Sequence, residues 1–203
     1  MGGIPKFCLP IADNKSILEW HVEHMRRTCG RIRVCTRAHW IPIIQGMKLD
    51  DVELLAIEPS TMSDAVAKMW MGADDLHVIG MPDTYILNSE NGAFYDQLAA
   101  STADITLASW KCHDELRGRV GQIQIESDGR VSDSVDKQAG CDFPDMWGAM
   151  ALRRVTLDRA LPHPGVQVKS WITEGRGVRA FRAAGTYMDI GTVTGLKMLY
   201  KSL

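Results

Sequence analysis

Short apolar runs alternate with segments of helical periodicity through the first half of this 203-residue chain. The strand-like runs cover 31–36, 52–57, 76–81 and 104–110, and the helical segments cover 16–30, 60–72 and 89–100. The first helical segment opens on a capping box, Ser16-Ile-Leu-Glu19, and ends at Gly30. Because strands joined through helices pair in parallel, the alternation predicts a parallel sheet with helices on both faces.

The second half of the chain adds antiparallel features. Residues 120–125 alternate between apolar and polar side chains, and Ser127-Asp-Gly-Arg130 predicts a turn into a second strand at 131–135. We expect further strands at 147–152 and 178–183, and helices at 155–161, 168–174 and 193–203. With no internal repeat or linker, residues 1–203 are expected to form a single α/β domain, a three-layer α/β/α sandwich around a mixed, mostly parallel, Rossmann-like sheet.

Composition narrows the function classes. The net charge of -2 gives no bulk electrostatic case for a nucleic acid or membrane partner. No segment resembles a signal peptide, and no apolar run approaches the ~18 residues of a membrane span. Five cysteines without a CxxC pair argue against a disulfide framework and a zinc site. These features predict a cytoplasmic protein.

Two aspartates stand where strand-like runs end. Asp83 follows the run at 76–81, after Pro82, and Asp189 closes the segment 185–189. Open α/β sheets bind ligands outside the carboxyl ends of their strands. Either aspartate alone is better explained as a turn or helix-cap residue. As a pair they favour a Mg²⁺ site in which the ion is held together with substrate phosphates.

Two lysines and two histidines complete the set of candidates. Lys6 and Lys137 carry compact charges that suit phosphate, although each taken alone is better explained as an ordinary surface lysine. His21 and His24 lie three apart on the first predicted helix with no evident third ligand. We therefore interpret the histidines as partly exposed helix residues.

Five short motifs follow one another in the order found in a known enzyme family. They are Gly3-Ile-Pro-Lys6 continuing to Ile11 and Glu19, Met81-Pro-Asp83-Thr84, the strand glycine Gly121, Val135-Asp136-Lys137, and Gly185-Thr-Tyr-Met-Asp189-Ile-Gly-Thr192. In this order the chain resembles the sugar-1-phosphate nucleotidyltransferases, which include glucose-1-phosphate thymidylyltransferases. The motifs span residues 3 to 196, and five in sequence are more specific than any one of them.

The resemblance implies a nucleotide-diphospho-sugar transferase-like fold and a reaction. A nucleoside triphosphate and a sugar 1-phosphate would give a nucleotide sugar and pyrophosphate, with Mg²⁺ bound by Asp83 and Asp189 and with Lys6 also catalytic. Gly121, Asp136 and Lys137 would bind the sugar phosphate. A homo-oligomer is compatible with the resemblance but is not specified by it.

Two further positions match the segment with which the family recognises the base. Glu58 and Ser63 stand where the family has Gln and Gly. The replacement of Gln by Glu exchanges an amide donor for an acceptor. The base preference therefore stays open.

One departure concerns the start of the chain. The family begins with a strand and a glycine-rich GxGTR loop that holds the triphosphate, whereas only Met1-Gly-Gly-Ile4 precedes Pro5 here. Loss of a central strand would leave two unpaired buried edges in the sheet. We hypothesise that Met1 is an internal methionine and that about 13 to 15 preceding residues supply the strand and loop.

Two other functions remain open. The first is a catalytically inactive homologue that binds nucleotide or sugar phosphate and regulates a partner subunit; the retained aspartates count against it. The second is a nucleotide-sugar-dependent glycosyltransferase of similar fold. Such enzymes usually carry an Asp-x-Asp metal motif, and no strand-like run here ends in one.

Overall fold

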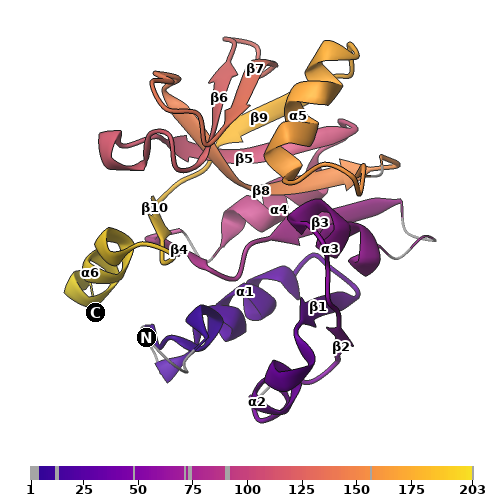
Figure 1. Cartoon of the computed structure of the whole chain (residues 1–203), viewed down its shortest axis with the longest axis vertical. Coiled ribbons are helices and arrows are strands. Elements are labelled where there is room, and N and C mark those ends of the chain that lie inside the picture. The colour runs from indigo at the N-terminus through magenta and orange to yellow at the C-terminus, as the bar shows by residue number, and fades with distance from the viewer. Residues whose placement is uncertain are drawn as a thin grey trace.

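The computed structural model describes residues 5–11, 14–47, 49–70, 72, 75–89, 92–155 and 157–202. The α-helices are α1 (Ile17–Met25), α2 (Ile41–Gln45), α3 (Met62–Met69), α4 (Ala93–Ala100), α5 (Pro164–Thr173) and α6 (Val193–Ser202), with short 3-10 helices at Lys6–Cys8, Ala38–Trp40 and Asp114–Leu116. The strands are β1 (Ile32–Thr36), β2 (Val52–Ala56), β3 (Leu76–Gly80), β4 (Thr84–Leu87), β5 (Ile105–Lys111), β6 (Gly121–Ile125), β7 (Val131–Asp136), β8 (Asp145–Arg153), β9 (Val178–Arg182) and β10 (Thr186–Asp189). Figure 1 shows their arrangement.

The long strand β8 organises the main sheet. That sheet has the order β7-β6-β8-β5-β9, and β3 also pairs with β8. All of these pairs are antiparallel except β5 with β9. The sequence correctly predicts the β6–β7 hairpin and the strands of this sheet to within two residues at each end.

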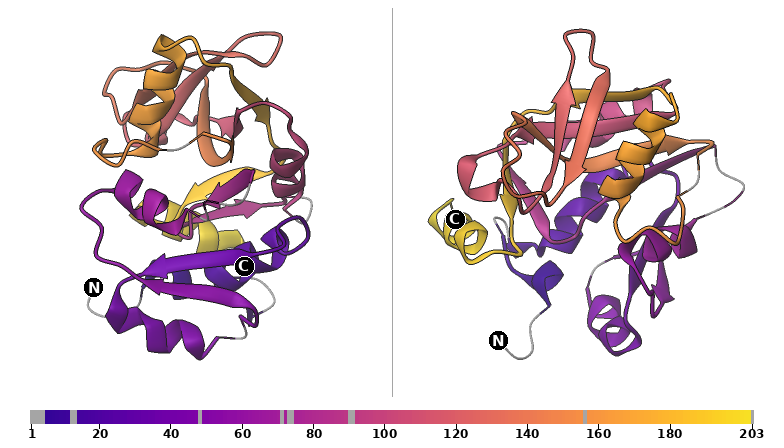
Figure 2. Two further views of the ribbon diagram at one scale, coloured as in Figure 1. Left: turned by 90° about the vertical axis from the view of Figure 1, so that its right-hand side faces the viewer. Right: turned by 45° about the horizontal axis from the view of Figure 1, so that its top comes forward.

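Helices cover both faces of the main sheet. Alternating residues of β5 and β8 point to opposite sides: Ala108 and Ala149 belong to a core cluster with α4, whereas Leu107 and Met150 belong to a second cluster with α5. This alternation follows from the two-residue period of a strand. Figure 2 shows the α5 layer and the sheet beneath it. The predicted three-layer α/β fold with a mixed sheet is confirmed.

The expectation that the sheet is mostly parallel is wrong. In the described part of the chain, parallel ladders join only β1 to β2 and β5 to β9, and the remaining ladders are antiparallel. The reason is the position of β8, which lies between β3, β5 and β6 and runs against all three. The helical connections early in the chain do not bring β1 or β2 into this sheet; these two strands form a sheet of their own.

Several local expectations also need correction. Residues 155 and 157–161 form no helix, and the helix of this region starts at Pro164, where proline is favoured because its missing N–H is not needed in the first turn. The sequence indicated the strand-like segment 185–189 that becomes β10, but it did not indicate α2 or β4 as regular elements. His21 is buried, with 5% of its surface exposed, so the expectation of a partly exposed residue is wrong.

Two general expectations can be compared with the described residues. The cysteines among them form no disulfide. No helix in the same ranges has the length and apolar composition that crossing a bilayer requires.

Candidate active site

The pairing of β4 with β10 brings Asp83 and Asp189 together. Asp189 lies opposite Thr84 in the antiparallel register, so the two aspartates meet at one end of this ladder. The Ile190 N–H donates to the Asp83 carbonyl oxygen at 3.0 Å, which ties the two loops to each other. The Gly191 N–H donates to Asp189 Oδ1 at 2.8 Å and orients that carboxylate. Two residues 106 positions apart in sequence therefore lie close together.

The electrostatics of Asp83 reflect this proximity. Burial raises the pKa of the Asp83 carboxyl, and the negative charge of Asp189 raises it further. Lys6 and Lys137 lower the pKa of the same carboxyl but do not cancel the increase. Asp189, Lys6 and Lys137 thus all act on Asp83 through space.

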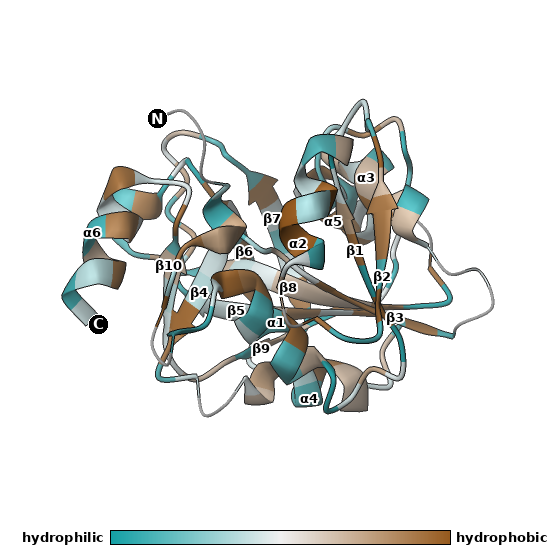
Figure 3. Ribbon diagram, turned by 90° about the horizontal axis from the view of Figure 1, so that it is seen from below, coloured by the Kyte–Doolittle hydropathy of each residue, from teal (hydrophilic) through white to brown (hydrophobic). Residues whose placement is uncertain are grey.

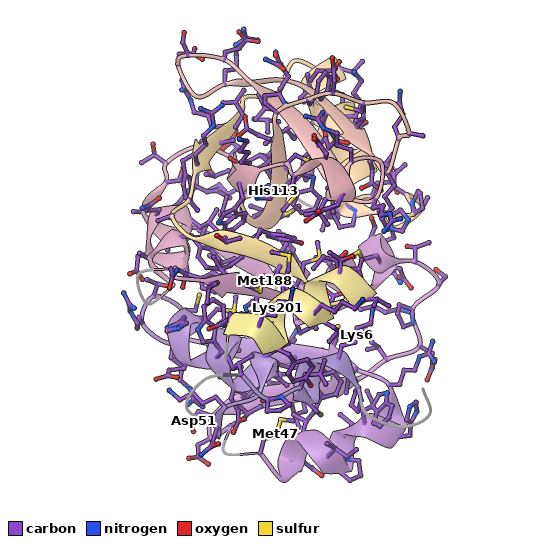
Figure 4. All side chains as sticks on the ribbon, turned by 90° about the vertical axis from the view of Figure 1, so that its left-hand side faces the viewer. Lys6, Met47, Asp51, His113, Met188 and Lys201 are labelled. Carbon is purple, nitrogen blue, oxygen red and sulfur yellow. The ribbon has the colours of Figure 1, made fainter. Side chains whose placement is uncertain are left out.

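Lys6 lies beside Asp189 at the turn between β10 and α6. A Cβ atom at Gly191 would lie 2.6 Å from Asp189 Oδ1 and 3.1 Å from Lys6 Nζ, so both charged groups contact this glycine. The exposed Lys6 side chain follows Pro5, and Figure 4 shows it near α6. The ammonium group can therefore meet a substrate phosphate that approaches the aspartate pair.

The end of the β6–β7 hairpin that lies away from its turn brings together Gly121, Asp136 and Lys137. Gly121 lies opposite Asp136 in the ladder, and the Lys137 N–H donates to the Val120 carbonyl at 3.2 Å. Lys137 is exposed and has a φ of 51°, a left-handed conformation that ends the strand. A side chain at residue 121 would collide with Trp147, since a Cβ atom there would lie 2.3 Å from the indole Nε1.

Asp136 faces a helix rather than open solvent. A Cβ atom at Gly165 would lie 2.8 Å from Asp136 Oδ1, which puts this carboxylate against the first turn of α5. A helix N-terminus stabilises negative charge, so Asp136 has a structural role available besides sugar binding.

Glu58 and Ser63 do not join the aspartate cluster through any described contact. Glu58 is exposed, and its carbonyl accepts from Lys68 Nζ at 3.4 Å. Ser63 is fully buried at the start of α3, and its hydroxyl has no hydrogen-bond partner among the described atoms. Its side chain is therefore not presented to a base, although Met62 beside it lines the same cavity as Lys6 and Asp83.

The donor set at the site suits a hard cation bound together with a substrate. No group of three or more His, Cys, Asp or Glu side chains in metal-binding proximity occurs among the described residues. Mg²⁺ in proteins commonly takes one or two carboxylates and completes its coordination with phosphate oxygens and water. Asp83 and Asp189 supply the two carboxylates, and the repulsion between them would be relieved by a cation.

Two supporting features were not identified from the sequence. Burial raises the pKa of the Tyr187 phenol, and the charges of Asp83 and Asp189 add to the increase, which places this tyrosine beneath the site. His21 hydrogen-bonds through Nε2 to the Thr84 carbonyl at 2.8 Å and through Nδ1 to the Tyr95 hydroxyl at 2.7 Å. The histidine thus fixes the loop that carries Asp83. The sequence signal for this contact is the helix that starts at the capping box, because its periodicity puts residue 21 on the inner face.

The comparisons with known proteins bear on the fold. By sequence, no family model and no curated protein matches the chain. By structure, it matches a protein assigned as a glucose-1-phosphate thymidylyltransferase from Bacillus anthracis, solved with sucrose, with a TM-score of 0.79 and 11% identity. That match covers 97% of this chain and 85% of the other. The fold is that of sugar nucleotidyltransferases.

Two further solved structures share this nucleotidyltransferase fold. HddC from Yersinia pseudotuberculosis, complexed with GMP-PN, has a TM-score of 0.70 at 18% identity, over 98% of this chain and 90% of that one. A UDP-glucose pyrophosphorylase complexed with UDP-glucose has a TM-score of 0.71 at 13% identity, over 98% of this chain and 92% of that one. At such identities the likeness concerns the fold alone.

Proposed function

We propose that this protein is a Mg²⁺-dependent nucleotidyltransferase that joins a nucleoside triphosphate to a sugar 1-phosphate. The observation that carries the proposal is the convergence of Asp83 and Asp189 at the end of the β4–β10 ladder, with Lys6 beside them. Two carboxylates and an ammonium group are suited to a polyphosphate bound with a cation. The structural neighbours that were solved with GMP-PN and with UDP-glucose lend support to nucleotide substrates.

The chemistry asks the protein mainly to position charged groups. An oxygen of the sugar phosphate forms a bond to the α-phosphorus, the bond from that phosphorus to the bridging oxygen breaks, and pyrophosphate leaves with the electron pair. When bound by Asp83 and Asp189, Mg²⁺ would neutralise negative charge on the phosphates. Lys6 and Lys137 would stabilise the charge that develops on the phosphate oxygens. No covalent intermediate with the protein is needed.

Lys6 and Lys137 lie at different places near the aspartate pair, so we assign them different roles. Lys6 contacts the same glycine as Asp189, so we assign it to the triphosphate next to the cation. Lys137 acts on Asp83 from the end of the hairpin, alongside Gly121, so we assign it to the sugar phosphate. The attacking oxygen of the sugar phosphate and the leaving pyrophosphate would then lie on opposite sides of the α-phosphorus, which an in-line displacement requires.

The test is a pyrophosphate-release assay with Mg²⁺, using each of the four common nucleoside triphosphates against a panel of sugar 1-phosphates. We expect one pair to release pyrophosphate and expect Asp83→Asn and Asp189→Asn to abolish the release. The exposed loop residue Asp142 provides a matched control, and Asp142→Asn should retain full activity. Tight nucleotide binding without turnover would favour an inactive regulatory homologue, and cleavage of a nucleotide sugar would favour a glycosyltransferase.

A further inference from the structure

A buried carboxylate in the first turn of α3 has two cationic partners. The Asp64 side chain is 6% exposed, and its Oδ2 accepts from Lys68 Nζ at 2.8 Å. Its Oδ1 accepts from Arg159 Nε at 2.9 Å and from Arg159 Nη2 at 2.8 Å. Ser60 also donates to Oδ2, from its N–H at 3.1 Å and from its hydroxyl at 3.3 Å. Charge-assisted hydrogen bonds of this kind have a defined direction, so they can hold neighbouring segments in a fixed relation.

The two cationic partners differ in what they connect. Lys68 lies one turn further along the same helix, so its pair with Asp64 is local to α3. Arg159 lies 95 positions away from Asp64, in the loop that leads into α5. Of the two ion pairs, the one with Arg159 therefore joins α3 to a distant part of the fold.

Two further hydrogen bonds accompany the Arg159 pair. The Thr61 hydroxyl donates to the Arg159 carbonyl at 3.2 Å, and the Met62 N–H donates to the Pro162 carbonyl at 3.2 Å. The helix α5 begins at Pro164, two residues later. Figure 3 shows α3 and α5 together at the side of the molecule away from α6. The start of α3 is thus bound to the segment from which α5 starts.

The loop that carries Arg159 is itself fixed to α5. The Asp158 N–H donates to Gln167 Oε1 at 2.7 Å, and Gln167 is a buried residue of that helix. The Asp158 carboxylate in turn accepts from the Ala160 N–H at 2.9 Å. A displacement of Arg159 relative to Asp64 would therefore move the start of α5 relative to α3.

Both helix starts border the candidate active site. Met62 of α3 and Pro164 of α5 line the same cavity as Lys6, which we assign to the triphosphate. A Cβ atom at Gly165 would lie 2.8 Å from Asp136 Oδ1, so α5 also contacts the side of the site that we assign to the sugar phosphate. The relative position of α3 and α5 therefore affects the distance between the two bound substrates.

We propose that Asp64 and Arg159 are a positioning pair, which ties α3 to α5 and thereby sets the distance between the bound nucleotide and the bound sugar phosphate. This inference rests on the proposed function. The pair acts through the two helices and makes no contact with either substrate. Since a displacement of about 1 Å can cost a factor of about 10² in rate, loss of the tie should lower kcat while each substrate still binds alone.

Two substitutions each remove one cation from the same carboxylate. Arg159→Gln breaks the pair between the elements, and Lys68→Gln breaks the pair within α3. We expect Arg159→Gln to lower kcat at least about tenfold, while the Kd of each substrate alone, measured by calorimetry, changes by less than about twofold. Lys68→Gln is the matched control and should change kcat by less than about twofold. Equal losses of kcat in both variants, or a weaker Kd for one substrate with kcat unchanged, would overturn the proposal.

The Met62 amide reports on the tie without turnover. Met62 is the first residue of α3, so its N–H has no acceptor within the helix and is protected from exchange by the Pro162 carbonyl. By NMR, we expect the Met62 amide to exchange at least about tenfold faster in Arg159→Gln and at an unchanged rate in Lys68→Gln. The Ala65 amide, which donates within the first turn of α3, should be unaffected in both variants. Equal Met62 rates in the two variants would overturn the tie.

The conservative variant Arg159→Lys separates positioning from a general loss of structure. Its ammonium group can still pair with Asp64, so we expect it to keep most of kcat and a protected Met62 amide. A kcat as low as that of Arg159→Gln would overturn the proposal. Absence of pyrophosphate release from the unaltered protein would overturn the proposed function, and with it the role of the pair in catalysis. The Met62 exchange rates would still decide whether the pair ties α3 to α5.

Discussion

At the scale of single residues, the like charges of Asp83 and Asp189 repel each other. Burial adds to the free-energy cost of ionising Asp83, and the attraction of Lys6 and Lys137 offsets only part of that cost. The candidate site is therefore a place where the folded protein tolerates an unfavourable charge. Such tolerance is typical of functional sites, where binding energy rather than stability determines the residues.

The raised pKa of Asp83 predicts the effect of removing its charge. Between the ordinary pKa of an aspartate and the raised folded value, the folded state binds more protons than the unfolded state, so this carboxyl lowers stability as pH rises. We expect Asp83→Asn to increase the free energy of unfolding at pH 7 in EDTA, measured by urea denaturation. Asp142→Asn is the control and should leave stability unchanged. A less stable Asp83→Asn protein would contradict this account of the site.

His21 supplies a second prediction, of opposite sign. Burial lowers the pKa of His21 to about 4, while the unfolded chain keeps the ordinary value near 6.5. The unfolded state then binds more protons in this window, so the stability that neutral His21 contributes is lost as pH falls from 6.5 towards 4. We expect the free energy of unfolding to fall by about 2 kcal/mol between pH 8 and pH 5 from this group alone.

The His21→Asn variant isolates that contribution. It should lose most of the pH dependence between 6.5 and 5 while being less stable at pH 8, because its amide cannot make both hydrogen bonds of the imidazole. The exposed His39 offers a matched variant, His39→Asn, that should keep the dependence. An unchanged pH profile in His21→Asn would show that another group titrates.

The residues of the site differ in how far the sequence reveals them. Asp83 and Asp189 could be found because each follows or ends a strand-like run, and strand ends meet at one edge of a sheet. Tyr187 and His21 could not, because their importance depends on which distant segments cover them. The roles assigned to Glu58 and Ser63 came from a resemblance alone. Because Ser63 is fully buried, its hydroxyl is not accessible to a substrate.

At the scale of elements, strands with strong patterns were predicted and weak ones were not. The β6–β7 hairpin has strict alternation and a glycine turn, so its sequence specifies it locally. β4 and β10 are four residues each, and they exist through their pairing with one another. The expectation of a mostly parallel sheet rests on the alternation of strands and helices along the chain. That alternation gives no information on β8, which lies between β3, β5 and β6 and pairs antiparallel with each.

The β6–β8 contact predicts the cost of a side chain at residue 121. A Cβ atom there would lie 2.3 Å from Trp147 Nε1 and 3.0 Å from two other indole atoms. Trp147 is buried and cannot move away freely, so Gly121→Ala should destabilise the protein by about 1–3 kcal/mol. Gly177→Ala, where a Cβ would meet nothing within 4 Å, should change stability by less than about 0.5 kcal/mol. Thermal and urea denaturation measure both, and equal effects would contradict the packing role of Gly121.

At the scale of the whole molecule, the main sheet and the β1–β2 pair are stabilised by hydrophobic clusters of different size. The main sheet is covered on both faces by large buried clusters. The β1–β2 pair has a smaller cluster of its own, which includes Leu18, Val22, Ile32 and Ile44. A two-stranded sheet is marginally stable without further strands. The two parts should therefore open at different free energies.

Native-state hydrogen exchange of the 203-residue chain tests this difference. We expect amides of β1 and β2 to exchange through openings at least about 2 kcal/mol below those of β5 and β8. The low-lying opening should involve both β1 and β2 together, because they protect only each other. Uniform protection across all four strands would mean that the β1–β2 pair is already integrated with the main sheet.

The most direct test of the central claim follows the transferred phosphorus. With Mg²⁺ and the pair of substrates that turns over, ³²P at the α position of the nucleoside triphosphate should appear in a nucleotide sugar, and ³²P at the γ position should appear in pyrophosphate. Asp83→Asn and Asp189→Asn should each lower the rate by a factor of about 10²–10³. Transfer of the γ label to the sugar, or undiminished α transfer in both variants, would contradict a nucleotidyltransferase whose phosphates are held at Asp83 and Asp189.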